Sequence, residues 1–352
     1  MVRSLGESVS MVEVMPNGDV FAGGWDGRLV RWDEQGTVRW SIETGNRISA
    51  IAINDEAIVV TSGLHLVALD PETGSQRWSV ALEGSADDVR WWNNEILAVS
   101  SVYDIEHNDF LESAIWRFDS SGECIWVERM DERPWVVLEL GSDLYAGLGR
   151  PRCGWLKIGK TPPFEHVLPP TSFPVMSGTS GRKHMLFGQT DGSVVSHETK
   201  VVSTESGAVE HLNILPVGFA ASTDAGHLTI RNDAGELQWE SKGDPIVAQH
   251  EGLVVDGKRL VWIARATGDA GKLSVHDALD GSVITSASLS RIRSIASTPT
   301  RTVVGCEDGE VLVWDSELLS RRLTQGSTSE DGPVDERKAA LQAKLLALRQ
   351  SK

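Results

Sequence analysis

Residues 17–42, NGDVFAGGWDGRLVRWDEQGTVRWSI, contain three short strand patterns separated by tight-turn sequences. The Asp-Gly pair at 26–27 and the Gln-Gly pair at 35–36 predict the two turns, because a two-residue hairpin requires positive φ and glycine adopts it without steric cost. A fourth strand is expected at 9–15, just before this stretch. Four antiparallel strands in about 35 residues are typical of one β-propeller blade.

The same unit recurs along the chain at a mean step of about 40 residues. Its third strand ends at Trp32-Asp33, and comparable strand ends continue as far as Trp314-Asp315. The first and last of these aspartates are 282 residues apart in seven steps, which predicts eight repeats. We therefore expect an all-β fold: an eight-bladed β-propeller of four-stranded antiparallel blades, with a short C-terminal α-helix.

A tryptophan placed four residues after a glycine is the second repeated marker. The glycine closes the turn between strands three and four, and the tryptophan then projects from strand four. Such a side chain can wedge between neighbouring sheets and bury roughly 150–250 Å² of ring surface. The residues expected to dock one blade on the next in this way are Trp40, Trp78, Trp126 and Trp239.

These repeats resemble those of two propeller families. Residues 68–78, ALDPETGSQRW, are similar to the tryptophan-docking repeat of quinoprotein-dehydrogenase-like (PQQ-like) propellers, which are eight-bladed. Residues 26–33, DGRLVRWD, and 308–315, DGEVLVWD, resemble the strand ending of WD40 repeats. The resemblance covers residues 1 to about 322 and is clearest in blades 1, 2, 3, 6 and 8. Because these motifs are structural in both families, the resemblance implies a fold and no activity.

The quinoprotein resemblance also raises an enzymatic alternative. Such enzymes are typically exported, carry a calcium ion beside the quinone and often have a vicinal disulfide. This chain has no export signal and no adjacent cysteines. It also lacks an HExxH sequence, a Cys/His pair at zinc spacing and a GxSxG elbow. We therefore expect no catalytic residue, no cofactor and no metal.

Composition and charge limit the classes of partner. The formal net charge is −17, which disfavours non-specific nucleic-acid binding because that binding needs Lys and Arg to neutralise phosphates. No stretch of 18 apolar residues exists, so no membrane span is expected. The first 14 residues lack the apolar run of a secretory signal. Three cysteines in different blades, Cys124, Cys153 and Cys306, are expected to be reduced thiols, which favours a cytoplasmic protein.

Blade 3 carries the longest insertion, residues 103–113 between its second and third strands. By propeller topology this loop opens on the same face as the blade-to-blade connections, where ligand and partner sites usually lie. Its acidic side chains could hold a cation, but the spacing lacks the glycine and terminal glutamate of a calcium loop, and a solvated acidic loop is the alternative. As a partner-binding loop it would use two aromatic anchors and the polar residues between them. The candidate residues are Tyr103, Asp104, Glu106, His107 and Phe110.

A Gly/Arg-rich segment of blade 4, residues 147–154, places Arg150 and Arg152 around Pro151. Arginine forks match carboxylates and phosphates, so an anion site is conceivable there. A surface turn is the alternative.

The end of the chain leaves two questions open. We expect the propeller to span residues 1–324, with residues 318–324 as the outer strand of the last blade; the alternative is that residues 2–5 supply this strand and join the two ends of the chain. A flexible linker is expected at 325–332 and an amphipathic helix at 333–352. Its apolar stripe supplies three further candidate partner contacts: Leu341, Leu345 and Leu348.

The sequence thus favours a non-catalytic propeller that acts as a protein-protein interaction scaffold or complex subunit. It identifies neither the partner nor the oligomeric state. The alternative is a propeller enzyme or small-molecule binder with a site at the mouth of the central channel. Such a site would show converging polar groups with shifted pKa values at the starts of the first strands, whereas a scaffold would show an apolar patch or loops.

Overall fold

The computed structural model describes residues 1–106, 108–181 and 184–326, which form eight four-stranded antiparallel sheets and one helix. Blade 1 contains β2 (Val9–Val14), β3 (Val20–Gly24), β4 (Arg28–Trp32) and β5 (Val38–Glu43); blade 2, β6 (Ile51–Ile53), β7 (Ile58–Ser62), β8 (His65–Leu69) and β9 (Gln76–Ala81); blade 3, β10 (Ser85–Trp92), β11 (Glu95–Asp104), β12 (Asp109–Phe118) and β13 (Cys124–Met130); blade 4, β14 (Pro134–Leu140), β15 (Asp143–Leu148), β16 (Trp155–Ile158) and β17 (Glu165–Val167). Blade 5 contains β18 (Val175–Ser180), β19 (Met185–Gln189), β20 (Ser193–Ser196) and β21 (Val201–Thr204); blade 6, β22 (Val209–Leu215), β23 (Gly218–Thr223), β24 (His227–Arg231) and β25 (Leu237–Lys242); blade 7, β26 (Ile246–Val255), β27 (Lys258–Thr267), β28 (Ala270–Asp277) and β29 (Val283–Ser290); blade 8, β30 (Ile292–Ser297), β31 (Arg301–Cys306), β32 (Glu310–Asp315) and β1 (Val2–Ser4); α1 (Ser316–Gly326) follows. The predicted eight-bladed propeller is confirmed.

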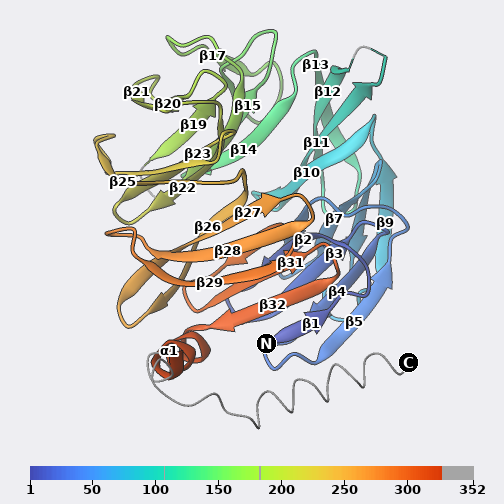
Figure 1. Cartoon of the computed structure of the whole chain (residues 1–352). Helices are drawn as coiled ribbons and strands as arrows, with labels where there is room; N and C mark the ends of the chain where they lie inside the picture. Colours follow the sequence, from blue (N-terminus) through green and yellow to red (C-terminus); the bar gives the residue numbers. More distant parts are fainter. Residues whose placement is uncertain (107, 182–183, 327–352) are drawn as a thin grey trace.

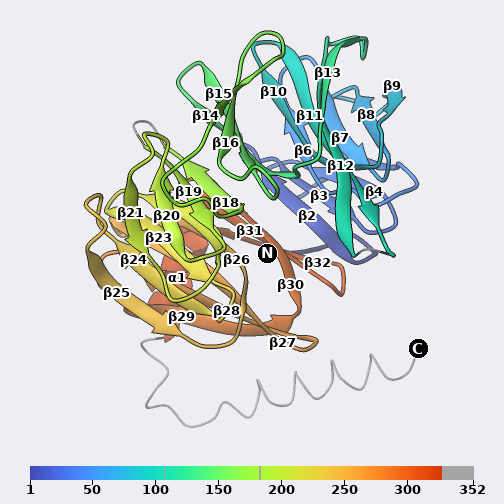
Figure 2. The same cartoon turned by 90° about the horizontal axis from the view of Figure 1, so that it is seen from above.

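The blades follow one another around the ring in chain order, so that the first and last blades lie side by side (Figures 1 and 2). The outer strand of blade 8 is β1, in which Val2 is paired with Leu312 and Ser4 with Glu310. The expectation that residues 318–324 form this strand is therefore wrong, and the alternative is correct. The two ends of the chain close the ring within one sheet.

Residues 318–324 are helical because Asp315 caps the start of α1. Its Oδ1 accepts the backbone N–H of Leu318 at 2.7 Å, which satisfies one of the amides that has no partner within the helix. Leu319 is 3 % exposed and packs with Leu253 and Trp262 of blade 7. The propeller thus ends at residue 315, and the helix covers the first part of the expected linker. The helix predicted at 333–352 lies outside the described residues.

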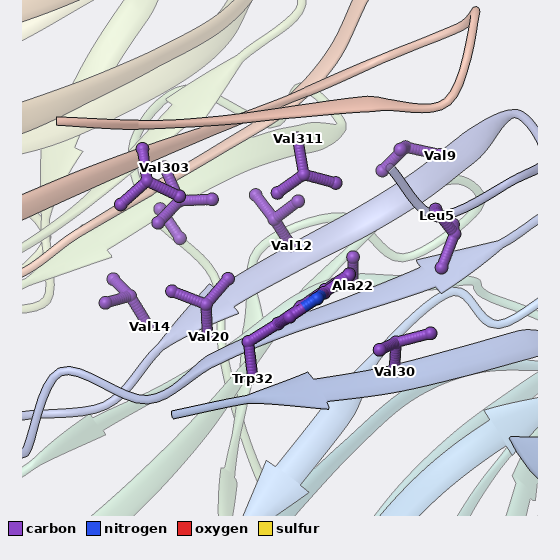
Figure 3. Packing of buried hydrophobic residues seen from close by; sticks show 12 residues of the cluster. Leu5, Val9, Val12, Val14, Val20, Ala22, Val30, Trp32, Val303 and Val311 are labelled. Carbon is purple, nitrogen blue, oxygen red and sulfur yellow. The ribbon is translucent and has the colours of Figure 1, made fainter. Parts of the chain in front are cut away.

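Valine-rich strands fill the interface that closes the ring. Val9 and Val12 of β2 meet Val303 and Val311 of blade 8 in one buried cluster (Figure 3). The inner strands approach each other so closely that a Cβ atom on Gly305 would lie 2.4 Å from a methyl carbon of Val9. Apolar burial is the main favourable term in folding, so this dry contact joins blades 8 and 1.

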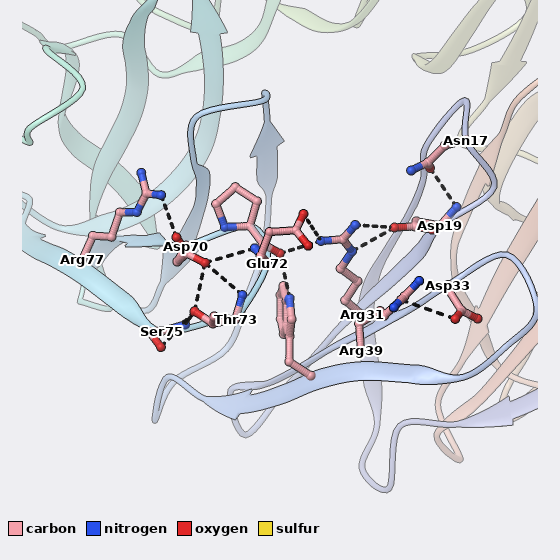
Figure 4. A network of polar contacts seen from close by, with 12 residues as sticks. Asn17, Asp19, Arg31, Asp33, Arg39, Asp70, Glu72, Thr73, Ser75 and Arg77 are labelled. Atoms are coloured by element: carbon pink, nitrogen blue, oxygen red, sulfur yellow. Dashed lines mark hydrogen bonds and ion pairs between the residues drawn. The ribbon is translucent and has the colours of Figure 1, made fainter.

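Charged groups bridge the outer part of the blade interfaces. Between blades 1 and 2, Arg31 contacts Asp19 of its own blade at 2.6 Å and lies 3.7 Å from Glu72 of the next (Figure 4). Side chains of Arg31 and Asp19 are 15 % and 9 % exposed, so solvent screens this pair weakly. Arg31 also donates to the carbonyl oxygen of Pro71, so its guanidinium connects blade 1 with blade 2.

The four marker tryptophans each contact the following blade. The Nε1 of Trp40 donates to the carbonyl oxygen of Pro71 at 2.9 Å, and the ring lies against Gly74, where an added Cβ would be 2.8 Å from the indole. Equivalent donations join Trp78 to Ser120 (3.0 Å), Trp126 to Lys160 (2.8 Å) and Trp239 to Ala278 (3.1 Å). All four stand on the outer strands of their blades; Trp40 is 7 % exposed, whereas the other three are only partly buried.

Candidate partner-binding site

One face of the ring carries both the strand 2–3 hairpins and the blade-to-blade connections. In seven blades, an N–H at the end of strand two donates to a carbonyl oxygen in the segment just before strand one of the same blade. These bonds are Trp25 to Ser8 (3.0 Å), Gly63 to Arg47 (3.0 Å), Gly149 to Arg133 (2.9 Å), Thr190 to Pro174 (3.0 Å), Asp224 to Ala208 (3.0 Å), Ala266 to Pro245 (3.1 Å) and Glu307 to Arg291 (2.8 Å). We call this side of the ring the loop face.

The blade 3 insertion is mostly a long hairpin on this face. Strands β11 and β12 have 10 residues each and remain paired up to Asp104 and Asp109, so little of the expected loop is free of the ladder. The rings of Tyr103 and Phe110, which face each other in the register, lie 5.1 Å apart at 65°. The Glu106 N–H donates to Asp104 at 2.8 Å. His107 lies outside the described residues.

The two predicted anchors join an aromatic cluster that includes blade 4. Phe110 and Trp135 contact edge to face at 5.8 Å and 84°. The guanidinium of Arg133 lies 4.1 Å from the first ring centroid and 4.2 Å from the second. Tyr103 is 47 % exposed and Trp135 is 40 % exposed, so these rings present apolar area to solvent. We call Tyr103, Phe110, Arg133 and Trp135 the aromatic cluster.

Beside the aromatic cluster a groove of about 880 Å³ crosses blades 3, 4 and 5. Its lining residues are Asp109, Phe110, Leu111, Asp131, Arg133, Trp135, Gly149, Arg150, Pro151, Phe173, Pro174, Met176 and Thr190. Phe173 is 47 % and Leu111 53 % exposed, so apolar side chains flank the groove on both sides. The groove has room for an extended segment of another chain.

The two arginines around Pro151 have different surroundings. Arg152 forms an ion pair with Glu132 at 2.8 Å, which raises the pKa of the arginine and belongs to a structural turn. Arg150 is exposed, lines the groove and forms no ion pair with any described residue. Only Arg150 is therefore placed where an anion from outside can reach it.

The channel mouth offers no cluster of catalytic groups among the described residues. A β-bulge lies at the start of strand one in seven blades. The bulged residues are Ser10, Asp87, Trp135, Met176, Glu210, Val247 and Arg293, a mixed set in which the two acids are in blades 3 and 6. No three Asp, Glu, His or Cys residues of the described chain gather as metal ligands do.

Two buried titratable groups, Glu13 and His211, lie on the first strands of blades 1 and 6. Burial raises the pKa of Glu13 and lowers that of His211, and each has its own backbone partner. The Glu13 carboxylate accepts the Val14 N–H at 3.0 Å, and His211 contacts the Ile246 oxygen at 3.2 Å. Burial also raises the pKa of Cys306 to about 12, so its thiol is not a nucleophile at neutral pH. All three cysteines are free thiols.

Sequence reasoning found the two anchors of blade 3 and missed the residues that complete the site. Arg133, Trp135 and Phe173 lie at blade starts and connections, where a propeller needs no aromatic or cationic side chain. Aromatic and cationic side chains at such a connection were therefore the available signal for a binding site. The tail residues Leu341, Leu345 and Leu348 lie outside the described residues. Across the described chain, no helix has the length and apolar character needed to cross a membrane.

Comparisons with known proteins agree with the fold. The profile of a family described as outer membrane protein assembly factor BamB matches residues 2–109. BamB from Moraxella catarrhalis is 16 % identical with a TM-score of 0.70, and the match covers 90 % of this chain and 98 % of that one. The computationally designed Ika8 protein is 15 % identical over 89 % and 98 % of the two chains with a TM-score of 0.70, and Sqt1 from Saccharomyces cerevisiae is 10 % identical over 89 % and 97 % with a TM-score of 0.69. None of the curated proteins matches. The predicted resemblance to PQQ-like and WD40 propellers is confirmed.

Proposed function

We propose that this protein is a non-catalytic interaction scaffold that binds a partner protein across the loop face of blades 3 to 5. The observation that carries the proposal is the aromatic cluster, which stands half-exposed beside the groove. Tryptophan, tyrosine and arginine are the residues most enriched among binding hot spots. Exposed apolar area of this kind, gathered in one place and bordered by charges, is typical of protein-protein interaction sites.

The fold supports the same conclusion. Eight blades held by tryptophan docking and dry interfaces form a rigid support, and binding residues on loops of a rigid support lose little conformational entropy on association. One relative in fold, BamB, is described as an assembly factor, which is a non-enzymatic role. The enzymatic alternative at the channel mouth, the cytoplasmic location and a second contact through the tail stay predictions.

The test is partner recovery from the native host with variants of the aromatic cluster. Phe110→Ala and Trp135→Ala should each reduce recovery of the bound protein by at least about tenfold, as loss of a hot spot does. The control is Leu279→Ala, which removes a more exposed apolar side chain (72 % exposed) from the β28–β29 turn on the other face. Recovery that stays at the control level in both variants, with unchanged melting temperatures, would contradict the proposal.

A further inference from the structure

A second group of arginine and aromatic side chains lies on the loop face, over blades 8, 1 and 2. Trp25, at the β3–β4 turn, is 39 % exposed. The guanidinium carbon of Arg47 lies 4.0 Å from its ring centroid and that of Arg293 lies 5.6 Å away. One indole thus faces two cations, one from each neighbouring blade.

This group is continuous with the aromatic cluster through a shared carboxylate. Asp87, the bulged residue of blade 3, forms an ion pair with Arg133 at 3.3 Å. The same carboxylate also acts electrostatically on Arg47. Five consecutive blades, from 8 through 4, therefore present alternating cations and rings. We call Trp25, Arg47, Arg293 and the aromatic cluster together the arginine–aromatic arc.

Some arginines on this face have an acidic partner within the chain, and others are available to carboxylates of another molecule. Arg293 is already paired with Glu307 at 2.7 Å, and Arg133 with Asp87. Arg47 is exposed and forms no ion pair with any described residue, as is true of Arg150 in the groove. An arginine held by stacking on an aromatic ring keeps its edge N–H groups free, and these match a carboxylate in a two-pronged geometry.

We propose that the arginine–aromatic arc binds an extended acidic segment of the partner protein, in which carboxylates alternate with apolar or aromatic side chains. The carboxylates pair with Arg47 and Arg150, while the apolar side chains pack on Trp25 and enter the groove. This assignment rests on the proposed function and adds the chemical class of the partner.

A nucleic acid fits the same surface less well. Its phosphates carry a charge at every step, and such a chain would meet Asp87 beside Arg133 and Asp109 and Asp131 along the groove. A peptide can place its carboxylates only where arginines stand. The acidic body as a whole repels a uniform polyanion more strongly than a peptide with a few charges.

The test uses the full chain and a phage-displayed library of random 12-residue peptides. Selection should enrich peptides that combine Asp or Glu with aromatic residues, and a fluorescein-labelled peptide of the enriched sequence should bind more weakly as salt rises. Arg47→Glu should weaken that binding at least tenfold, and Arg47→Lys should weaken it less. The control is Arg321→Glu, an exposed arginine on α1, which should leave binding unchanged.

The outcomes separate the two proposals. Enriched peptides that need Trp135 but contain no excess of acidic residues would overturn the acidic class and leave the scaffold function in place. Enriched peptides insensitive to both Trp135→Ala and Arg47→Glu, or no enrichment at all, would contradict both. Fluorescein-labelled poly(U) that binds the wild type and is lost in Arg47→Glu would overturn the peptide assignment in favour of RNA.

Discussion

The indole of Trp239 stacks on the imidazole of His276, with ring centroids 5.7 Å apart and planes inclined by 19°. The tryptophan comes from blade 6, and its Nε1 donates to the Ala278 oxygen of blade 7. His276 is 6 % exposed and contacts the Gly281 oxygen at 3.1 Å and the Ser274 hydroxyl at 3.0 Å. A titratable ring therefore supports one of the four docking contacts.

This arrangement predicts that stability falls in mild acid. Burial lowers the pKa of His276, and Arg265 lowers it further, against the opposing effect of the Gly281 carbonyl. The unfolded chain therefore takes up its proton near pH 6.5 while the folded one does not, so the free energy of unfolding decreases as pH falls from about 6.5 toward the folded pKa. Urea titrations at pH 7.5 and pH 5.0 measure the difference in the free energy of unfolding between the two conditions. The His276→Gln substitution should reduce this difference.

A second buried histidine is the reference for that experiment. Burial also lowers the pKa of His211, so the His276→Gln variant should keep part of the pH dependence. If the free energy of unfolding of His276→Gln depends on pH as strongly as that of the wild type, the His276 ring does not contribute to the pH dependence.

The docking tryptophans should differ in their effect on stability according to burial. Trp40→Ala removes a ring that is 7 % exposed and should cost about 3–5 kcal/mol, as large core truncations do. Trp78→Ala should cost less, because that ring is only partly buried. Urea unfolding gives both values, with Leu279→Ala as the exposed control. A loss of under about 1 kcal/mol for Trp40→Ala would contradict the docking role.

The N-terminal strand should be essential for the closed ring. Deleting residues 1–4 removes every pair between β1 and β32 and leaves an open sheet edge on blade 8. We expect the melting temperature to fall by more than about 5 °C, which for a domain of this size corresponds to roughly 3 kcal/mol. Differential scanning calorimetry measures the shift, and an unchanged transition would show that blade 8 is stable with three strands.

The C-terminal tail gives a contrasting prediction from sequence. Truncation after Gly326, and separately Leu345→Asp, should leave the melting temperature within a few degrees while partner recovery falls. The reason is that an isolated amphipathic helix with only a short apolar stripe is marginal in water and gains stability by docking. Recovery at the wild-type level in both variants would mean that the tail takes no part in binding.

Local patterns predicted most of the fold. Positive-φ glycines at hairpin turns, such as Gly27 and Gly36, and the Trp-Asp strand ends are short-range signals that depend on neighbouring residues alone. From these signals, the predicted boundaries of blades 1 to 7 agree closely with those of the structure. They could not decide which segment completes blade 8, because that choice depends on a pairing between opposite ends of the chain. The N-cap at Asp315, followed by Ser316 and Glu317, was a local signal for a helix that strand periodicity concealed.

The candidate site was less predictable than the fold. Tyr103 and Phe110 lie in one insertion, so their proximity follows from the sequence. The contacts with Trp135 and Arg133 cross a blade boundary. Trp25, Arg47 and Arg293 come from three different blades, and only the curvature of the ring brings them together.

The pairing of β1 with β32 in blade 8 also limits the order in which the chain can fold. Met1 and Val313 exchange backbone hydrogen bonds although 312 residues separate them, so β1 is synthesised long before the strand with which it pairs. Contacts of such long range make folding slow, and until closure β32 is an unpaired edge. During that interval, the first strand of one nascent chain can pair with β32 of another. Slow closure therefore makes strand exchange between copies the characteristic misassembly of this ring, and crowded synthesis the condition that favours it.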